Sequence, residues 1–220
     1  MIKSLGLLLP AIVLIACSPA PAEGQTTAGV PKPTASELDE LHTAYFASGC
    51  FWCVEAVFES VEGVAEAVSG YSGGEESNPT YRQVSAGQTG HAEAVKVYYD
   101  STVVDFPTLV KVFFGSHDPT TLNRQGPDRG TQYRSIAFYD NWAEKEIIED
   151  YIEQLESSGE YDPGAIVTEV SKFVRFWEAE EYHQDYERRN PNNPYVRSVS
   201  IPRLRRFQAK YPELLKEEAH

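Results

Sequence analysis

The stretch that spans residues 43–61 reads Thr-Ala-Tyr-Phe-Ala-Ser-Gly-Cys-Phe-Trp-Cys-Val-Glu-Ala-Val-Phe-Glu-Ser-Val. It opens with a short, largely apolar run that stops at Gly49, as a buried strand does before a turn. Beyond Gly49, apolar side chains recur at the i, i+3, i+4, i+7 spacing of one helix face, at Val54, Val57, Phe58 and Val61. The stretch therefore predicts a strand that leads directly into a helix.

The rest of the chain continues this alternation of strands and helices. Strand patterns also cover residues 64–71, 91–99 and 133–139, and a second helix begins at Asp105 with Pro107 in its first turn. Further elements are expected in chain order: loops at 75–90 and 117–132, a helix at 142–156, a strand at 165–170, and helices at 180–189 and 202–211. The leading order β-α-β-β-α-β is that of a split β-α-β arrangement. We predict an α+β fold with a ferredoxin-like split β-α-β core, a mixed or antiparallel sheet, extra helices and a long irregular C-terminal segment.

The junction between the first strand and the first helix carries two cysteines. Cys50 lies in the first helical turn, where unpaired N–H groups and the helix dipole favour an anion, so its thiol pKa is expected to be low. Cys53 is three residues further on, on the same helix face and within disulfide reach. A structural disulfide and a buried helix cysteine remain alternatives. The Cys-x-x-Cys spacing also occurs in thioredoxin-like enzymes and zinc ribbons, but no second pair exists here to complete a zinc site.

Several further motifs accompany this junction in a fixed order. They are Gly-Cys-Phe-Trp at 49–52, Gly-Tyr-Ser-Gly-Gly at 70–74, Asn-Pro-Thr-Tyr at 78–81, Thr-Gly-His-Ala-Glu-Ala-Val at 89–95, His-Asp-Pro-Thr-Thr at 117–121, Gln-Gly-Pro-Asp-Arg-Gly-Thr-Gln-Tyr-Arg-Ser at 125–135, and Tyr-His-Gln at 182–184. From about Tyr45 to about Tyr186 the chain resembles the type A peptide methionine sulfoxide reductases. The resemblance implies reduction of the S epimer of methionine sulfoxide, in proteins and as the free amino acid.

The resemblance also implies which residues carry the chemistry. Cys50 is the nucleophile that attacks the sulfoxide sulfur, and Glu93 is the acid that protonates or hydrogen-bonds the sulfoxide oxygen. The hydroxyls of Tyr81 and Tyr133 assist Glu93. For Glu93 to keep its proton near neutral pH, its surroundings must be desolvated, because burial raises the pKa of a carboxyl group.

The same resemblance assigns residues to substrate binding. Phe51 and Trp52 form the walls of a pocket for the methyl group, and Tyr81, Tyr133 and His183 complete the substrate-binding set. Asp128 occupies a family position near the site, where it orients neighbouring groups or water.

The attack leaves a sulfenic acid on Cys50, which a second thiol must resolve. No cysteine follows Cys53, so Cys53 is the only intramolecular candidate, and it would close a Cys50–Cys53 disulfide. The resemblance implies re-reduction by an external thioredoxin-like thiol with no bound cofactor or metal, and a monomeric enzyme. Three alternatives stay open: a thiol-disulfide oxidoreductase, a hydrolase that pairs Cys50 with His183 or His91, and a non-catalytic envelope lipoprotein.

The N-terminus indicates export. Residues 1–16 carry Lys3 and an apolar run too short to span a bilayer, which is the pattern of a secretory signal. Residues 14–17, Leu-Ile-Ala-Cys, resemble the lipobox of bacterial lipoproteins, which implies lipidation of Cys17; the alternative is a plain signal peptide with a chance cysteine. Ser18 at the next position favours the outer membrane. We therefore expect a lipid-anchored protein of the bacterial cell envelope, on the periplasmic face of the outer membrane, that repairs oxidised envelope proteins with a thioredoxin-like envelope reductant.

These patterns divide the chain into three parts. The predicted parts are a signal peptide at 1–16, a lipidated N-terminus with a Pro-, Ala- and Thr-rich linker at 17–40, and a single catalytic domain at 41–220 with its core at 43–189 and a C-terminal helical extension at 190–220.

The composition narrows the function classes. With 41% hydrophobic and 24% charged residues, the 220-residue chain is an ordinary globular protein, which excludes wholesale disorder and a polytopic membrane protein. The net charge is −14, so broad nucleic-acid binding is not expected. Three cysteines are too few for a disulfide framework.

Overall fold

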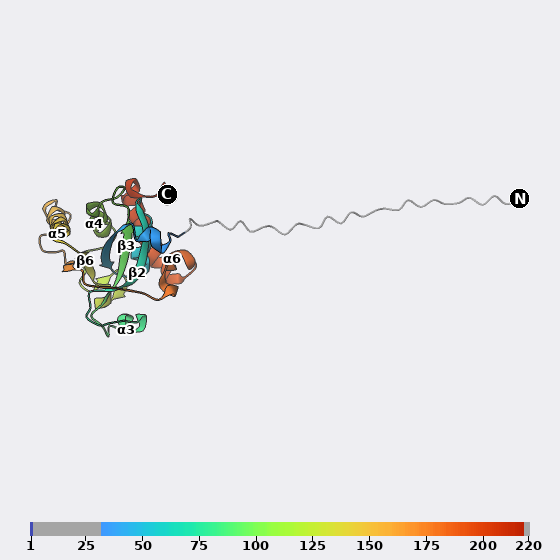
Figure 1. Cartoon of the computed structure of the whole chain (residues 1–220), viewed down its shortest axis with the longest axis horizontal. Helices are drawn as coiled ribbons and strands as arrows, with labels where there is room; N and C mark the ends of the chain where they lie inside the picture. The colour runs from blue at the N-terminus through green and yellow to red at the C-terminus, as the bar shows by residue number, and fades with distance from the viewer. Residues whose placement is uncertain (2–31, 218–220) are drawn as a thin grey trace. The chain divides into compact units, whose positions relative to one another are not determined.

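A mixed β-sheet forms the centre of the fold (Figure 1). In the described part of the chain the sheet has six strands in the order β7-β6-β1-β3-β2-β8. The strands are β1 (His42–Ser48), β2 (Val64–Ser72), β3 (Ala92–Tyr99), β6 (Ser135–Tyr139), β7 (Glu169–Lys172) and β8 (Phe176–Glu178). All neighbouring strands run antiparallel except β6 and β7, which are parallel.

The central strands and two helices have the predicted connectivity. Helix α2 (Phe51–Glu59) connects β1 to β2, and helix α4 (Phe106–Gly115) connects β3 to β6. Strand β3 lies between β1 and β2, so each β-α-β unit is split by a strand from elsewhere in the chain. The predicted α+β class with a ferredoxin-like core is therefore confirmed.

The computed structural model describes Met1 and residues 32–217. The predicted signal peptide, Cys17 and most of the predicted linker lie outside the described residues, and those predictions stay predictions. The described residues from Lys32 onward belong to one compact unit, whose first helix is α1 (Ala35–Leu38). Contacts of the domain thus begin inside the segment that we assigned to the linker. Within the described residues, no helix combines the length and the apolar character needed to cross a membrane.

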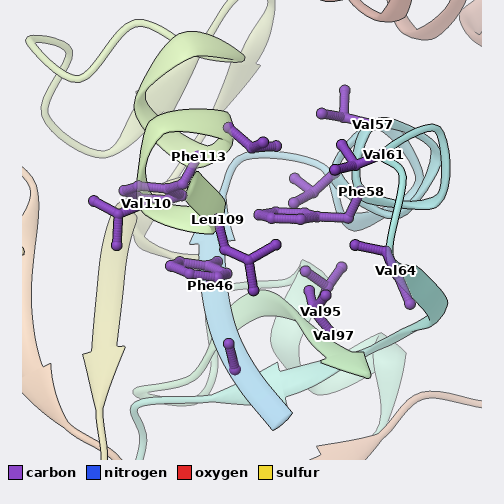
Figure 2. Close-up of a cluster of buried hydrophobic side chains, with 14 of the residues drawn as sticks. Phe46, Val57, Phe58, Val61, Val64, Val95, Val97, Leu109, Val110 and Phe113 are labelled. Carbon is purple, nitrogen blue, oxygen red and sulfur yellow. The ribbon is translucent and has the colours of Figure 1, made fainter. Parts of the chain in front are cut away.

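Helices α2 and α4 pack on the same face of the sheet and enclose the main core (Figure 2). The Phe46 ring of β1 stacks between Phe58 of α2 and Phe113 of α4, with 5.1 Å between ring centroids on each side. Val95 and Val97 of β3 complete the floor. The apolar positions predicted for the first helix face, Val54, Val57, Phe58 and Val61, are all buried, and each such side chain contributes about 1.5–3 kcal/mol by leaving water. Helix α5 (Trp142–Ser157) lies next to α4 and β6 (Figure 1).

The two predicted loops contain regular structure that we did not predict. Helix α3 (Tyr81–Ser85) forms within 75–90 because the Thr80 and Gln83 side chains form a capping box at its start. Within 117–132, β4 (Arg124–Gln125) and β5 (Asp128–Arg129) pair as a small hairpin. The predicted strand at 133–139 starts only at Ser135, because Thr131–Tyr133 form the 3-10 turn η1.

The C-terminal third differs most from the predictions. The strand expected at 165–170 is β7 at Glu169–Lys172, and β8 was missed. The helix expected at 180–189 is interrupted, because Asp185 adopts a left-handed backbone with φ of 53°. The elements there are the 3-10 turn η2 (Glu181–His183), α6 (Tyr186–Arg189), the π-helix η3 (Val196–Ser200), α7 (Ile201–Lys210) and the 3-10 turn η4 (Pro212–Leu214).

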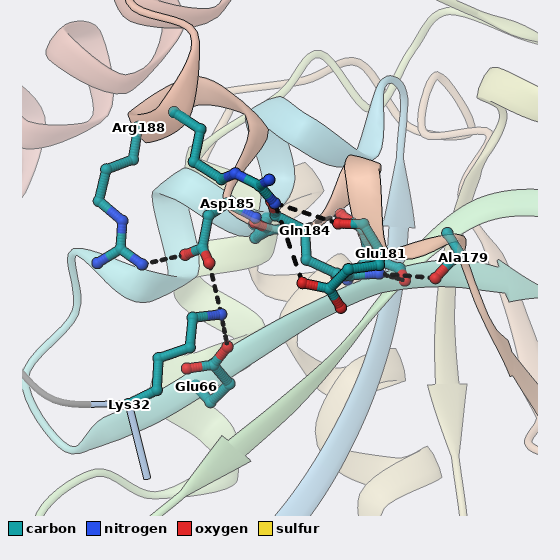
Figure 3. A network of polar contacts seen from close by, with 10 residues as sticks. Lys32, Glu66, Ala179, Glu181, Gln184, Asp185 and Arg188 are labelled. Atoms are coloured by element: carbon teal, nitrogen blue, oxygen red, sulfur yellow. Dashed lines mark hydrogen bonds and ion pairs between the residues drawn. The ribbon is translucent and has the colours of Figure 1, made fainter.

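A polar network fastens this interrupted segment to the edge of the sheet (Figure 3). The Gln184 side chain accepts the N–H of Ser69 at 2.9 Å and donates to its carbonyl oxygen at 3.0 Å. Lys32 pairs with Glu66 at 2.7 Å and with Asp185 at 2.5 Å. These contacts fix the position of His183, which lies in the same turn.

Candidate active site

The turn between β1 and α2 brings the two cysteines into the interior. Gly49 has a φ of 92°, and a Cβ atom there would lie 2.6 Å from the Cβ of Gln125, so only glycine fits. Cys50 is the N-cap residue of α2 and is 6% exposed, whereas Cys53 is 2% exposed. Both are free thiols.

Glu93 lies on β3 next to this turn. Its side chain is 1% exposed, and its Oε2 atom accepts the backbone N–H of Phe51 at 3.1 Å. Burial raises the pKa of Glu93 to about 8 and outweighs the opposite effect of that hydrogen bond, which lowers the pKa. The carboxyl group is therefore mostly protonated at neutral pH.

The expectation of a low pKa at Cys50 is wrong. Burial raises the pKa of the Cys50 thiol well above its usual value, and the neighbouring Cys53 and Glu93 add to this effect. Burial is the main reason; in addition, the Phe51 N–H at the helix start is bound by Glu93, and the Cys50 side chain makes no capping hydrogen bond.

Cys53 is the more acidic thiol of the pair. A hydrogen bond from Cys50, together with the charge of Arg203, lowers the pKa of Cys53 to about 7 against the opposing effect of burial. The negative charge of the reduced pair therefore belongs on Cys53.

An aromatic cluster adjoins Cys50. The Phe51 ring lies 5.1 Å from the His183 ring and 6.2 Å from Tyr81, and Tyr81 lies 4.2 Å from His183. Trp52 is partly exposed, and its indole stacks on Tyr186 with 3.7 Å between centroids. The structure thus brings the predicted residues Phe51, Trp52, Tyr81 and His183 together.

The His183 ring has one satisfied and one unsatisfied nitrogen. Trp52 Nε1 donates to His183 Nδ1 at 3.1 Å, so the ring proton is on Nε2. His183 Nε2 is buried without a hydrogen-bond partner in the described part of the chain. Burial lowers the pKa of His183 to about 4, so the ring is neutral at physiological pH.

The two predicted tyrosines come from different loops. Glu180 accepts the Tyr81 N–H at 3.1 Å and fixes the start of α3. The Gln132 side chain donates to the Ser85 carbonyl at 3.0 Å, which ties η1, and with it Tyr133, to α3. Burial and the nearby Glu93 raise the pKa of Tyr81 to about 12 and that of Tyr133 further, so both hydroxyls keep their protons.

Asp128 lies on the Cys53 side of the site. Its Oδ2 accepts the hydroxyl of Tyr195 at 2.6 Å, and the same hydroxyl oxygen is 3.9 Å from Cys53 Sγ. Tyr195 was not predicted as a site residue, because it follows an Asn- and Pro-rich stretch without any periodic pattern. Arg203 was not predicted either, although Phe207 at i+4 marks that helix face as the buried one.

His91 does not take part in the site. Its Nδ1 accepts the Gly74 N–H at 3.2 Å, and its Nε2 lies 2.8 Å from the Glu76 carbonyl oxygen. Among the described residues, neither His91 nor His183 hydrogen-bonds Cys50, so the hydrolase alternative lacks its catalytic pair.

One acidic cluster has the geometry of a metal site. Ligand atoms of Glu55, Glu59 and Asp185 lie within 4.8 Å of one another. Asp185 is paired with Lys32 and Arg188, and burial raises the pKa of Glu55 to about 8 and that of Glu59 to about 7. Ion pairs and protonation therefore neutralise this cluster.

Comparisons with known proteins agree with one family. A family profile described as "Peptide methionine sulfoxide reductase" matches residues 42–215. A peptide methionine sulfoxide reductase MsrA from Natronomonas pharaonis is 50% identical over 171 residues, which cover 78% of this chain and 96% of the relative. One from Rhodopirellula baltica is 49% identical over 190 residues, with coverage of 84% and 97%.

Solved structures show the same fold. The reduced form of Mxr1 from Saccharomyces cerevisiae superimposes with a TM-score of 0.62 at 34% identity, over 69% of this chain and 87% of that one. Methionine sulfoxide reductase A of Corynebacterium diphtheriae gives 0.60 at 37% identity, over 68% and 74%. From the family profile and the close relatives together, the chain belongs to the peptide methionine sulfoxide reductase family and is an enzyme that reduces methionine sulfoxide.

Proposed function

We propose that this enzyme reduces the S epimer of methionine sulfoxide, in oxidised proteins and as the free amino acid, by attack of Cys50 on the sulfoxide sulfur. The observation that supports this mechanism best is the position of Glu93. Its buried carboxyl group is bound to the N–H of the residue that follows Cys50, and it keeps its proton at neutral pH.

In the first step, Glu93 gives its proton to the sulfoxide oxygen and makes the sulfur electrophilic. Cys50 Sγ attacks, the S–O bond of the substrate breaks, and the oxygen is transferred to Cys50 as a sulfenic acid while methionine leaves. The thiol proton of Cys50 replaces the one that Glu93 gave. A neutral Cys50 beside a protonated Glu93 supplies the proton that this exchange requires.

The aromatic cluster binds the substrate. Phe51 and Trp52 receive the methyl group, and the hydroxyls of Tyr81 and Tyr133 hydrogen-bond the sulfoxide oxygen. The Nε2–H of His183 donates to an acceptor of the bound peptide, since a buried donor without a partner is costly. Asp128 acts through Tyr195 and orients the Cys53 side of the site.

In the second step, Cys53 attacks the sulfenic sulfur of Cys50, a disulfide forms and water leaves. An external thioredoxin-like dithiol then reduces the disulfide and is itself oxidised. The cycle requires no bound cofactor.

The chain acts in the cell envelope. The lipobox-like residues 14–17 support lipidation of Cys17 and attachment to the outer membrane, where the enzyme would repair oxidised proteins. Mass spectrometry of the mature protein tests the lipid on Cys17. Release of a Cys17→Ala variant from the membrane fraction is expected, and an unmodified mature N-terminus would disprove the anchor.

Single-turnover experiments test the chemistry. The experiment starts from the reduced enzyme without any reductant. One equivalent of the S sulfoxide of a methionine peptide should then give one methionine and convert the enzyme to the Cys50–Cys53 disulfide form. Cys50→Ser should give no methionine. Cys53→Ser should give one methionine and a sulfenic acid that a trapping reagent captures, followed by slow turnover with a dithiol. Equal turnover of Cys53→Ser and wild type would disprove the resolving role of Cys53.

A further inference from the structure

Arg203 connects the C-terminal helix α7 to the catalytic turn. Its guanidinium donates from Nη1 to the Ser48 carbonyl at 2.9 Å, from Nη2 to Ser48 Oγ at 3.0 Å, and from Nε to the Ser116 carbonyl at 2.7 Å. Ser48 lies two residues before Cys50, and Ser116 ends helix α4. Three hydrogen bonds therefore hold this cation behind the redox pair.

In the described part of the chain, Arg203 forms no ion pair. The side chain is 7% exposed, and among residues 32–217 no carboxylate oxygen lies within 4.0 Å of it. All three of its hydrogen-bond acceptors are neutral oxygens. A buried cation is unfavourable unless an anion compensates it, and the charge of Arg203 acts on two groups that can carry an anion, Asp128 and Cys53.

Cys53 is placed to supply that counter-charge. Arg203 and Cys53 line the same cavity of about 180 Å³, together with Asp128, Tyr195 and Arg206. Asp128 is a competing anion: burial raises its pKa, but its carboxylate accepts the Tyr195 hydroxyl, and the charge of Arg203 also lowers its pKa. The remaining groups that face Cys53 are Cys50, which donates to it, Ser200, and the protonated Glu93.

We propose that Arg203 is a positioning residue of the redox cycle, whose fixed charge keeps Cys53 as a thiolate next to Cys50. This proposal rests on the proposed function, in which Cys53 resolves the sulfenic acid of Cys50. The low pKa of Cys53 agrees with it, since the hydrogen bond from Cys50 and the charge of Arg203 both favour the anion.

A thiolate at Cys53 serves both halves of the second step. It attacks the sulfenic sulfur of Cys50, an S–S bond forms, the S–O bond breaks, and the leaving hydroxide takes a proton from Glu93, which recovers it from solvent. When a thiolate of the external dithiol attacks the Cys50 sulfur, the S–S bond breaks and Cys53 leaves as a thiolate. The second thiol of the dithiol then displaces Cys50, which takes up a proton, and the dithiol becomes a disulfide. A thiol of low pKa leaves fastest, so Arg203 directs the attack to Cys50.

The pH dependence of Cys53 alkylation tests this role. In a Cys50→Ser background, Cys53 is the cysteine of the redox pair that remains, and its rate of reaction with iodoacetamide reports the thiolate fraction. Alkylation at Cys53 is followed by peptide mass spectrometry. Arg203→Gln should raise the pH midpoint by about one unit or more, because a nearby opposite charge shifts a pKa by roughly that amount. Arg203→Lys keeps the charge and should leave the midpoint within a few tenths of a unit.

Two controls separate charge from structure. Ser48→Ala removes one hydrogen bond to Arg203 but no charge, and it should leave the midpoint unchanged. Circular dichroism and thermal melting show which variants are folded; if Arg203→Gln unfolds, the Lys variant decides. An unchanged midpoint in a folded Arg203→Gln variant, or a rise of a full unit in Arg203→Lys, would overturn the proposal.

Failure of the resolving role gives a different result. If Cys53→Ser turns over as fast as wild type with a dithiol, the proposed second step is wrong, whatever the alkylation midpoints are. If Cys53 does resolve, the pH midpoint of disulfide formation in the two-cysteine enzyme should move up in Arg203→Gln in parallel with alkylation. If the pH midpoint of disulfide formation in Arg203→Gln equals that of wild type, Arg203 has no role in the redox cycle.

Discussion

Glu93 Oε2 accepts the backbone N–H of Phe51 at 3.1 Å, directly beside the Cys50 side chain. The N–H at the start of α2 thus orients an acid and does not stabilise a thiolate on Cys50. In the proposed mechanism, the protonated carboxyl group of Glu93 and the neutral thiol of Cys50 meet the substrate, whereas the more acidic thiol of the pair is Cys53.

Replacing Glu93 by Gln should remove the proton donor and keep the acceptor for the Phe51 N–H. We expect kcat/KM to fall about 10²- to 10⁴-fold, as for loss of a general acid, in a dithiol-coupled assay on a sulfoxide peptide. The matched control is Glu55→Gln, also a buried carboxyl group but bound to Ser69 and Asp185, which should stay within a few-fold of wild type. A loss of less than tenfold in Glu93→Gln would exclude the acid role.

The rate of the first step should depend on pH through Glu93. Its raised pKa of about 8 means that the acid form is present at neutral pH and is lost as the pH rises through about 8. We expect the single-turnover methionine burst to slow over this range and the slowing to be absent in Glu93→Gln. A burst rate that is flat from pH 7 to 9 in wild type would contradict this assignment.

The free energy of unfolding should fall as the pH rises from about 5 to 8. Glu55, with a pKa of about 8, and Glu59, with one of about 7, bind protons in the folded state that the unfolded chain has released above its ordinary pKa. The stabilisation from these groups is therefore complete at a pH below the ordinary pKa of the unfolded chain. It is lost as the pH rises from there to the folded pKa of each group, by at most about 1.4 kcal/mol per pH unit for each group. Denaturant melts of Glu55→Gln should show a shallower pH dependence than wild type; an equal slope would show that Glu55 does not titrate in this range.

Trp52→Phe should weaken substrate binding more than catalysis. The change keeps an aromatic ring against Tyr186 but removes the Nε1–H that fixes His183. We expect KM to rise several-fold with kcat nearly unchanged, measured on a sulfoxide peptide. Trp142→Phe, at an indole that is 74% exposed on α5, is the matched control and should alter neither constant. A fall in kcat without a change in KM would place Trp52 in the chemical step.

Lys32→Met should destabilise the domain, because it leaves the buried carboxylates of Glu66 and Asp185 without this cation. Lys32 itself is partly exposed, so we expect about 1 kcal/mol, or a melting temperature lower by about 2–4 °C. Lys111→Met breaks the exposed pair with Glu213 and should cost only a few tenths of a kcal/mol. The difference between the two variants should shrink in about 1 M salt. Equal melting temperatures at low salt would show that the pairs of Lys32 do not stabilise the fold.

The sequence predicts the core of this fold well because the core is periodic. Helices α2 and α4 and strands β1 to β3 show clear spacings of apolar residues, and all of these elements form. The segment around His183 was wrongly predicted as one continuous helix, because its path is decided by contacts with residues far away in the chain. Gln184 binds Ser69 across 115 residues, and Asp185 takes a left-handed backbone there.

The site residues likewise fall into those that local sequence motifs predict and those that only tertiary packing brings in. Cys50, Glu93, Phe51 and Trp52 were found through motifs, and they do lie together. The pKa of Cys50 was mispredicted because its position in the helix alone reveals neither its burial nor the acceptor that takes the free N–H. Tyr195 and Arg203 reach Cys53 from the C-terminal segment through tertiary packing, which no local pattern encodes.

The hydrogen bonds from Arg203 to Ser48 join residues that are 155 positions apart. Such distant contacts carry the largest loop-closure entropy and close late in folding. A ribosome makes the two thiols early and the segment that covers them last, so the growing chain exposes its redox pair to oxidants before it can fold. No cysteine follows Cys53. In the proposed cycle, premature oxidation between these two neighbours gives a disulfide that the thioredoxin-like reductant reverses, so the maturing protein would tolerate an error that traps a chain richer in cysteine.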